Sequence, residues 1–323
     1  MKALICGSLA YDTIMVFQDQ FKNHILPDKV HILNVSFLVP RMRKEFGGCA
    51  GNISYNLKLL GGHPVPMGTV GQDFGPYREH FTRCGIDLSQ VKPIDDLYTA
   101  QAFITTDLDD NQITAFHPGR DDAQLREPRA RRAGRDVRHR RAGRARSDAA
   151  ARRPSSRERD IPFIFDPGQA MPLFNGDGVP RLHRAGAVRH ASTTTSRTCC
   201  SSAPAGAKTI IASRVKAYVV TRGPKGSQIN TTEGNLHIPP AHERRVSDPT
   251  GCGDAYRAGL IYGLMQRHGL DTVGRMASLM GALKVEHPGT QNQRFTLRRI
   301  RRPVPAAVRL RARLRRSVDS FDG

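Results

Sequence analysis

The chain has 323 residues, a formal net charge of +21, 38% apolar residues and six cysteines. A chain of this length can bury the core of one large α/β domain or of two smaller domains. The cysteines show neither a C-x-x-C pair nor the histidine spacing of a zinc site, and no apolar run reaches membrane-spanning length. We therefore exclude disulfide-rich, zinc-finger and membrane proteins, and we expect a cytoplasmic protein with free thiols and no membrane partner.

The positive charge is concentrated in three segments that contain arginine but no lysine. Residues 120–159 hold 15 arginines and 6 acids, residues 181–206 hold 4 arginines and no acid, and residues 294–323 hold 10 arginines and 2 acids. A nucleic-acid surface usually mixes lysine with arginine and interleaves aromatic residues, and the first two segments have no aromatic residue. We therefore do not expect nucleic acid as a partner, and a basic RNA-binding arm stays an alternative.

The same three segments are mixtures of Arg, Ala, Pro and Ser with almost no apolar periodicity. This composition is typical of GC-rich coding sequence translated out of frame, which is our hypothesis for their origin. Residues 1–293 are then interpreted as one domain that contains two anomalous segments, and residues 294–323 as a tail that is not native to the fold. A disordered basic tail is the alternative for 294–323.

The first predicted elements are a strand, a strand-rich extension and a helix. Residues 3–6 form a short buried strand, and residues 7–12 form the loop at its carboxyl end, where ligands of open α/β sheets bind. Residues 13–46 alternate loosely in hydrophobicity, which favours strands over a helix. The glycine-rich run 47–52 then opens a helix over 53–60, which ends at a pair of glycines.

The later part of the chain alternates between strand-like and helix-like patterns. In order, we predict a strand at 65–70, a helix through 81–84, a hairpin over 100–116, strands at 162–168 and 217–221, and helices at 255–266 and 273–285. This alternation predicts an α/β fold with a mostly parallel, doubly wound sheet flanked by helices.

The run Asp-Pro-Thr-Gly-Cys-Gly-Asp at 248–254 enters the predicted helix 255–266 directly. Glycines allow an anion to approach the backbone, and the first N–H groups of the helix point at it with the positive end of the helix dipole. A carboxylate beside such a site repels an anion, so Asp254 is best explained as a base that accepts a proton from an attacking hydroxyl. The alternative is a glycine turn with an ordinary first-turn acid.

This run resembles the C-terminal signature of the PfkB family, the ribokinase and adenosine kinase superfamily. The resemblance implies ATP-dependent phosphorylation of a primary hydroxyl on a small-molecule sugar or nucleoside, with Mg²⁺ bridging the phosphates. It implies that Asp254 is the catalytic base and that the backbone amides of Gly251, Cys252 and Gly253 form the anion hole. The implied fold is ribokinase-like, with a small lid of strands at about 13–46 and 96–118.

The glycine-rich run at 47–52 resembles the family's N-terminal substrate signature. Asp12, Gly48 and Asn52 match that signature position by position, which implies contacts with sugar hydroxyls. Residues 105–119 and 165–169 resemble the adenosine kinase branch, which implies a nucleoside phosphorylated at its 5′-hydroxyl; a ribokinase-like sugar kinase is the alternative. The further predicted substrate-binding residues are His117, which is equally consistent with a turn histidine, Asp166 and Gln169.

The run at 221–226 resembles the family's nucleotide-side turn, where a hydroxyl and backbone amides meet ATP. The predicted nucleotide-binding residues are therefore Thr221, Gly223, Gly226, Asp248 and Thr250. The family also carries an Asn-x-x-Glu element that positions the magnesium-bound phosphates, and residues 181–206, which occupy its place, contain neither Asn nor Glu. An inactive, frameshifted remnant of such a kinase and a basic nucleic-acid-binding protein are therefore the remaining alternatives. The lid strands could also pair across a homodimer.

Overall fold

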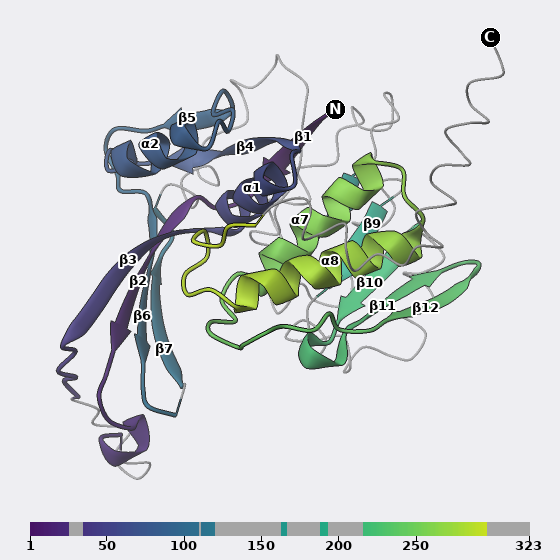
Figure 1. The fold of residues 1–323 in the computed structure, drawn as a ribbon. Helices are drawn as coiled ribbons and strands as arrows, with labels where there is room; N and C mark the ends of the chain where they lie inside the picture. The colour runs from purple at the N-terminus through teal and green to yellow at the C-terminus, as the bar shows by residue number, and fades with distance from the viewer. Residues whose placement is uncertain (26–34, 110, 120–162, 167–187, 193–215, 296–323) are drawn as a thin grey trace, which may run out of the picture.

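The computed structural model describes residues 1–25, 35–109, 111–119, 163–166, 188–192 and 216–295 (Figure 1). The arginine-rich segments lie outside these ranges, apart from residues 188–192 and 294–295, and Gln169 also lies outside them. No helix in the described part is long and apolar enough to cross a membrane.

Two sheets form the described body of the molecule, and most of their strands pair in parallel. The first sheet has the order β1(Lys2–Cys6)–β4(His63–Val70)–β5(Val91–Pro93), with both pairings parallel. The second sheet has the order β12(Gly234–Ile238)–β11(Ser227–Thr231)–β10(Ala217–Thr221)–β9(Val188–Ser192)–β8(Phe163–Phe165). Its strands β8, β9 and β10 are parallel, and the hairpin β11–β12 adds two antiparallel strands at one edge. The predicted α/β fold with a mostly parallel sheet is confirmed.

In the described residues, four helices pack on these sheets: α1(Cys49–Leu59), α2(Gly75–Arg83), α7(Cys252–Met265) and α8(Leu270–Val285). Helices α7 and α8 lie side by side over the five-stranded sheet (Figure 1). Their contact is close because Gly259 has no side chain: a Cβ there would lie 2.6 Å from the Cα of Ala277. Helix α1 joins β1 to α7 through a cluster of Ile5, Ile53 and Ala258. The loops before α1 and α7 are therefore held by a common core.

The lid is a separate sheet with the order β3(Arg41–Gly47)–β2(Ala10–Val16)–β6(Ala100–Thr106)–β7(Gln112–His117). It extends away from the body, as the purple and blue strands of Figure 1 show. Strand β2 begins at Ala10, so Asp12 lies within a lid strand and not in the loop that the sequence predicts. The reason is that β2 pairs with β3 and β6 along its whole length, which satisfies its backbone groups as a strand.

Candidate active site

The run at 248–254 forms the predicted loop at the start of a helix. Gly251 is the N-cap of α7 and has a φ of 80°, in the left-handed region that favours glycine. The amide of Cys252 donates to the carbonyl of Pro249 at 3.1 Å, so one of the three amides of the predicted anion hole is engaged within the loop. The first turn of α7 still presents N–H groups that helix geometry leaves without helical acceptors. Burial raises the pKa of the Cys252 thiol to about 11, which keeps it protonated near neutral pH and disfavours a nucleophilic role.

The carboxylate of Asp248 ties this loop to two other parts of the chain. It accepts from the amide of Thr250 at 2.9 Å and from the amide of Gly289 at 2.8 Å. The guanidinium of Arg43, on lid strand β3, lies 3.4 Å from it. Burial alone would raise the pKa of Asp248, but the bonds from Thr250 and Gly289 and the charge of Lys284 hold it below its ordinary value. Asp248 therefore acts as an anionic organiser of the loop.

Lys284, on α8, places a buried cation next to the loop. Its side chain is fully buried, and its ammonium group donates to the carbonyls of Asp248 at 2.9 Å and His287 at 3.0 Å. A Cβ on Gly251 would lie 3.6 Å from its Cε. Burial lowers the pKa of Lys284, and the neighbouring Asp248 opposes that effect. Sequence reasoning missed this residue, although a lysine inside the apolar run Ala-Leu-Lys-Val was a usable signal.

Asp254 lies at the centre of the site, where it is 7% exposed and bonded on both carboxylate oxygens. Its Oδ2 accepts from the side-chain Nδ2 of Asn52 at 2.9 Å, and its Oδ1 accepts from the guanidinium of Arg257 at 3.1 Å. Arg257 also forms an ion pair with Asp166. Burial disfavours the charge of Arg257, but the carboxylates of Asp166 and Asp254 outweigh this and raise its pKa above the usual range.

The structure therefore brings together Asn52, Asp166 and Asp254, which are far apart in the sequence. It also gives Asp166 a partner that the sequence did not predict, because Arg257 lies between Asp166 and Asp254. An arginine three residues after an acid at a helix start was the available signal, but it reads as an ordinary helical ion pair.

Asp12 is the third buried carboxylate of the site, after Asp248 and Asp254, with 9% of its surface exposed. Burial, followed by the charges of Asp254, Glu45 and Asp248, raises the pKa of Asp12 to about 7. The chain leaves no room beside it: a Cβ on Gly47 would lie 2.2 Å from its Oδ2. The glycine at 47 is thus required by the close approach of the lid carboxylate to the turn that precedes α1.

Gly48 has a different reason to be glycine. Its φ is 84°, and a Cβ there would lie 2.5 Å from the carbonyl oxygen of Ser8. The Gly-Gly pair therefore places the start of α1 directly against the loop that follows β1. This contact positions Asn52, in the first turn of α1, opposite Asp254.

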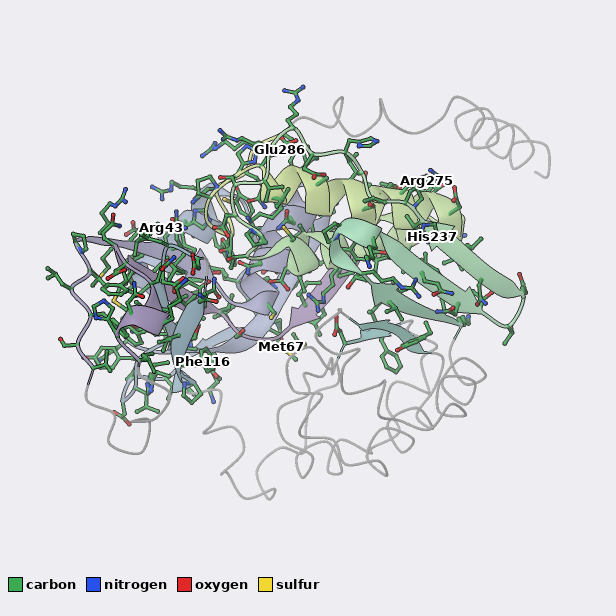
Figure 2. All side chains as sticks on the ribbon, turned by 90° about the horizontal axis from the view of Figure 1, so that it is seen from below. Arg43, Met67, Phe116, His237, Arg275 and Glu286 are labelled. Atoms are coloured by element: carbon green, nitrogen blue, oxygen red, sulfur yellow. The ribbon has the colours of Figure 1, made fainter. Side chains whose placement is uncertain are left out.

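The register of the lid strands places Phe116 and His117, two neighbouring residues of β7, on opposite faces of the sheet. Asp12 pairs with Ala102, and Ala102 pairs with Phe116, so Phe116 lies on the same sheet face as Asp12. His117 pairs with Gln101 and Gln101 with Tyr11, which places His117 on the opposite face. Phe116 is 51% exposed, and Figure 2 shows it with Arg43 at the lid end of the molecule. The geometry thus favours Phe116 over His117 as a contact for substrate.

The predicted nucleotide-side turn connects β10 to β11. Gly223 and Gly226 have φ values of 57° and 78°, and the amide of Arg222 donates to the carbonyl of Gly226 at 2.8 Å. Thr221 is the last residue of β10 and pairs with Ser227. The hydroxyl of Ser227 lies 2.7 Å from that of Tyr256, on α7, which ties the turn to the helix that follows the 248–254 loop.

The buried ammonium group of Lys284 and the left-handed backbone of Gly251 at the start of α7 fit a phosphate group. For the metal, the described residues contain no group of three or more His, Cys, Asp or Glu side chains arranged around one point. The residues of this site suit Mg²⁺ only when nucleotide phosphates and waters supply most of the metal ligands, which is the usual arrangement for this ion.

Comparison with known proteins points to one family. The model of the pfkB family of carbohydrate kinases matches residues 11–133 and 201–296. A nucleoside kinase of Burkholderia thailandensis, solved in complex with inosine, is 41% identical with a TM-score of 0.76, over 93% of this chain and 95% of that one. A structure of the same kinase in complex with ADP-inosine is 44% identical with a TM-score of 0.74, over 93% of each chain.

An archaeal relative agrees with this assignment. The nucleoside kinase of Methanocaldococcus jannaschii is 27% identical over 268 residues, which cover 80% of this chain and 85% of the relative. Its solved structure has a TM-score of 0.78, covers 93% of this chain and 96% of that one, and is described as an archaeal member of the ribokinase family. The ribokinase-like fold expected from the sequence motifs is confirmed.

Proposed function

The chain belongs to the pfkB family of carbohydrate kinases, and on that premise we propose that it is an ATP-dependent nucleoside kinase that phosphorylates the 5′-hydroxyl. The observation that carries this proposal is the placement of Asp254. Its carboxylate lies in the first turn of α7, beside the 248–254 loop, and it is bonded to Asn52 of the N-terminal substrate motif. Proton acceptor and phosphate loop are therefore adjacent, as in-line phosphoryl transfer requires.

In the proposed step, Asp254 takes the proton of the 5′-hydroxyl as that oxygen forms a bond to the γ-phosphorus of ATP. The bond from the γ-phosphorus to the bridging oxygen breaks, and ADP leaves. The amides of Gly251 and Gly253, with that of Cys252 if its bond to Pro249 opens, stabilise the charge of the transferring group. Mg²⁺ neutralises charge on the phosphates when it is bound. Thr221, Gly223, Gly226 and Thr250 are the proposed contacts for the rest of the nucleotide.

Asp12, Gly48 and Asn52 are the proposed contacts for the ribose. Asp12 and Asn52 offer an acceptor and a donor that are held by burial, and such fixed groups discriminate strongly against analogues that lack a hydroxyl. Asp166 is proposed to act mainly through Arg257, with which it is paired. His117, on the opposite face of the lid, and Gln169, outside the described residues, remain sequence-based predictions.

A nucleoside is favoured over a free sugar by two observations. The relatives of 41% and 27% identity are nucleoside kinases, and one of them is solved with inosine. In this chain, the aromatic ring of Phe116 stands on the Asp12 face of the lid, where it can stack on a base. ADP release with inosine, adenosine, guanosine, uridine and ribose tests this: we expect turnover with at least one purine nucleoside. Turnover with ribose alone would establish the sugar kinase instead.

The lid offers a proposed dimer contact. All six residues of β7 are exposed, and among the described strands β7 forms one edge of the lid sheet. We expect a homodimer whose lids pair, which sedimentation of the wild-type protein and of an Ile113→Lys variant can test. A cytoplasmic location is likewise a proposal, supported by the reduced thiols of Cys84 and Cys252.

The arginine-rich segments 120–159, 181–206 and 294–323 are proposed to be frameshift products. Resequencing the gene tests this directly, because the segments 120–159 and 181–206 must each be bounded by compensating insertions and deletions, and the segment 294–323 must begin at one. A thermal melt with and without inosine then separates an active kinase from an inactive remnant, since only a competent site raises the melting temperature by linkage.

A further inference from the structure

The segment 289–293, which follows α8, crosses the site and contacts both of its sides. Gly289 donates to Asp248 at 2.8 Å, Thr290 donates to the carbonyl of Phe46, and Asn292 donates to Glu45 at 2.8 Å. Gln291 and Gln293 point inward and are 3% and 0% exposed. Buried glutamines are uncommon and must be hydrogen-bonded, so each of them needs an explanation.

Gln291 bonds three side chains of the site. Its Nε2 donates to the Oδ1 of Asn52 at 3.0 Å and to the hydroxyl of Tyr77 at 2.6 Å. Its Oε1 lies 3.0 Å from the Nε2 of His80. The His80 ring is held between Phe46, with centroids 4.4 Å apart, and Tyr55, with centroids 5.6 Å apart.

The donor and acceptor role of every group in this chain of bonds is determined. The carboxylate of Asp254 can only accept, so Asn52 must turn its NH₂ group toward it and its Oδ1 toward Gln291. Tyr77 donates to the carbonyl of Gly47 at 2.8 Å, so it accepts from Gln291. His80 then donates to the remaining oxygen of Gln291. Burial raises the pKa of Tyr77 well above its ordinary value and lowers that of His80, so both are neutral near pH 7.

We propose that Gln291 is a positioning residue for phosphoryl transfer, because its amide fixes Asn52 in the orientation that presents N–H groups to Asp254 and to the nucleoside. One N–H of Asn52 holds the base, and the other is available for a hydroxyl of the substrate. Without Gln291, the Oδ1 of Asn52 loses its donor, and the side chain is held only by its bond to Asp254, so its NH₂ group is no longer fixed in position. This inference rests on the proposed nucleoside kinase function.

Gln293 provides a matched control. It has the same side chain, lies two residues away and is equally buried, but its Nε2 donates to Asn56 at 2.8 Å and not to Asn52. Gln291→Leu removes three side-chain hydrogen bonds and Gln293→Leu removes one, so the melting temperature should fall further in the Gln291 variant and is measured for both. Only Gln291 contacts the side chain that bonds the base.

The experiment compares full-length wild type with Gln291→Leu, Gln291→Glu and Gln293→Leu, using inosine and ATP. Gln291→Glu keeps the shape and the acceptor for His80 but cannot donate to Asn52, so it serves if the leucine variant does not fold. We expect kcat to fall by up to about 100-fold in both Gln291 variants, as for a small misplacement of reacting groups. The KM for ATP should stay within about twofold. In Gln293→Leu, kcat should stay near wild type, and Gln291→Glu, which keeps the acceptor for His80, is the Gln291 variant to compare with it at a similar melting temperature.

A double-mutant cycle completes the test. If Gln291 acts through Asn52, then Gln291→Leu should have no further effect on kcat in an Asn52→Ala background. Equal losses of kcat in the Gln291 and Gln293 variants, or additive losses with Asn52→Ala, would overturn the inference. Absence of nucleoside turnover in the wild type would instead refute the function on which it rests, so the two failures are distinguishable.

Discussion

The two sides of the candidate site, which we propose to bind phosphate and ribose, are built from different chemical groups. The phosphate side is built from main-chain N–H groups, a left-handed glycine and the buried cation of Lys284. The ribose side is built from side chains, namely the buried carboxylate of Asp12 and the amide of Asn52. The pKa values differ accordingly: that of Asp248, within the loop, is lowered, whereas that of Asp12 is raised to about 7. Substitutions on the two sides should therefore affect the two substrates separately.

The largest expected effect lies where the two sides meet, at Asp254. Asp254→Asn keeps the size of the side chain and removes the proton acceptor. We expect kcat to fall about 10²- to 10⁴-fold, the usual contribution of a general base. Binding of ATP, measured by calorimetry, should be unchanged, because the loop amides are retained. Turnover within a few-fold of wild type would refute the assigned base.

A smaller effect, confined to the phosphate side, is expected for Lys284→Met. This change removes the buried cation and leaves the carbonyls of Asp248 and His287 without their donor. We expect a cost of about 1–3 kcal/mol in stability for each unsatisfied group. We also expect a KM for ATP about 10-fold higher, the size of one charge acting over ~10 Å at an effective dielectric of ~20.

The KM for inosine should not change in the Lys284→Met variant. Lys58→Met, on α1, is the matched control, because it removes a lysine of a partly exposed helix surface. If the Lys284 variant raised both KM values equally, the separation between the two sides would be wrong at this position.

The ribose side should respond to pH through Asp12. Its carboxylate faces Asp254, Glu45 and Asp248, while Arg43 is paired with Asp248. The ionised form is the better acceptor for ribose hydroxyls, so the KM for inosine should fall about 10-fold between pH 6 and pH 8, as expected for a group of pKa about 7. The KM for ATP should be flatter, and Asp12→Asn should abolish the dependence for inosine.

Ionisation of Asp12 should improve inosine binding but lower the free energy of unfolding of the ligand-free protein. The folded-state pKa of Asp12 is raised from 3.8 to about 7, so its contribution to stability is fully present below pH 3.8 and is lost as pH rises toward 7. Melting temperatures of the wild type minus those of Asp12→Asn should therefore decrease between about pH 4 and pH 7. An unchanged difference would mean that the carboxylate is not buried as described.

The sequence predicted the main-chain parts of the site better than the side-chain network. Glycines at 48 and 251 are compatible with the positive φ found there, and the run at 248–254 indicates the start of a helix. Both are local properties of the backbone. The bounds of α1 and α7 differ from the prediction by only a few residues at their starts. Both helices begin inside the glycine-rich runs and not after them.

The apolar run around Lys284 was a usable signal, but Arg257 and Gln291 could not be predicted in the same way. Each is a polar residue that would read as solvent-exposed, and only packing from distant segments buries it. The hairpin β11–β12 was also missed, since it has few apolar residues and takes its stability from pairing with β10. Asp12 was placed in a loop because lid pairing is a long-range property.

The smallest expected effect concerns the outer part of the ribose side, where the base of a nucleoside would lie. Phe116→Ala removes the half-exposed ring that shares a lid face with Asp12. Loss of a stacked base costs about 1 kcal/mol or more, which corresponds to a roughly fivefold rise in the KM for inosine. His117→Ala is the matched control, because His117 is the next residue of β7, is also exposed and lies on the opposite face. If the histidine variant, and not the phenylalanine variant, raised the KM for inosine, the base would bind on the other face of the lid, and the separation into two sides would have to be redrawn around that face.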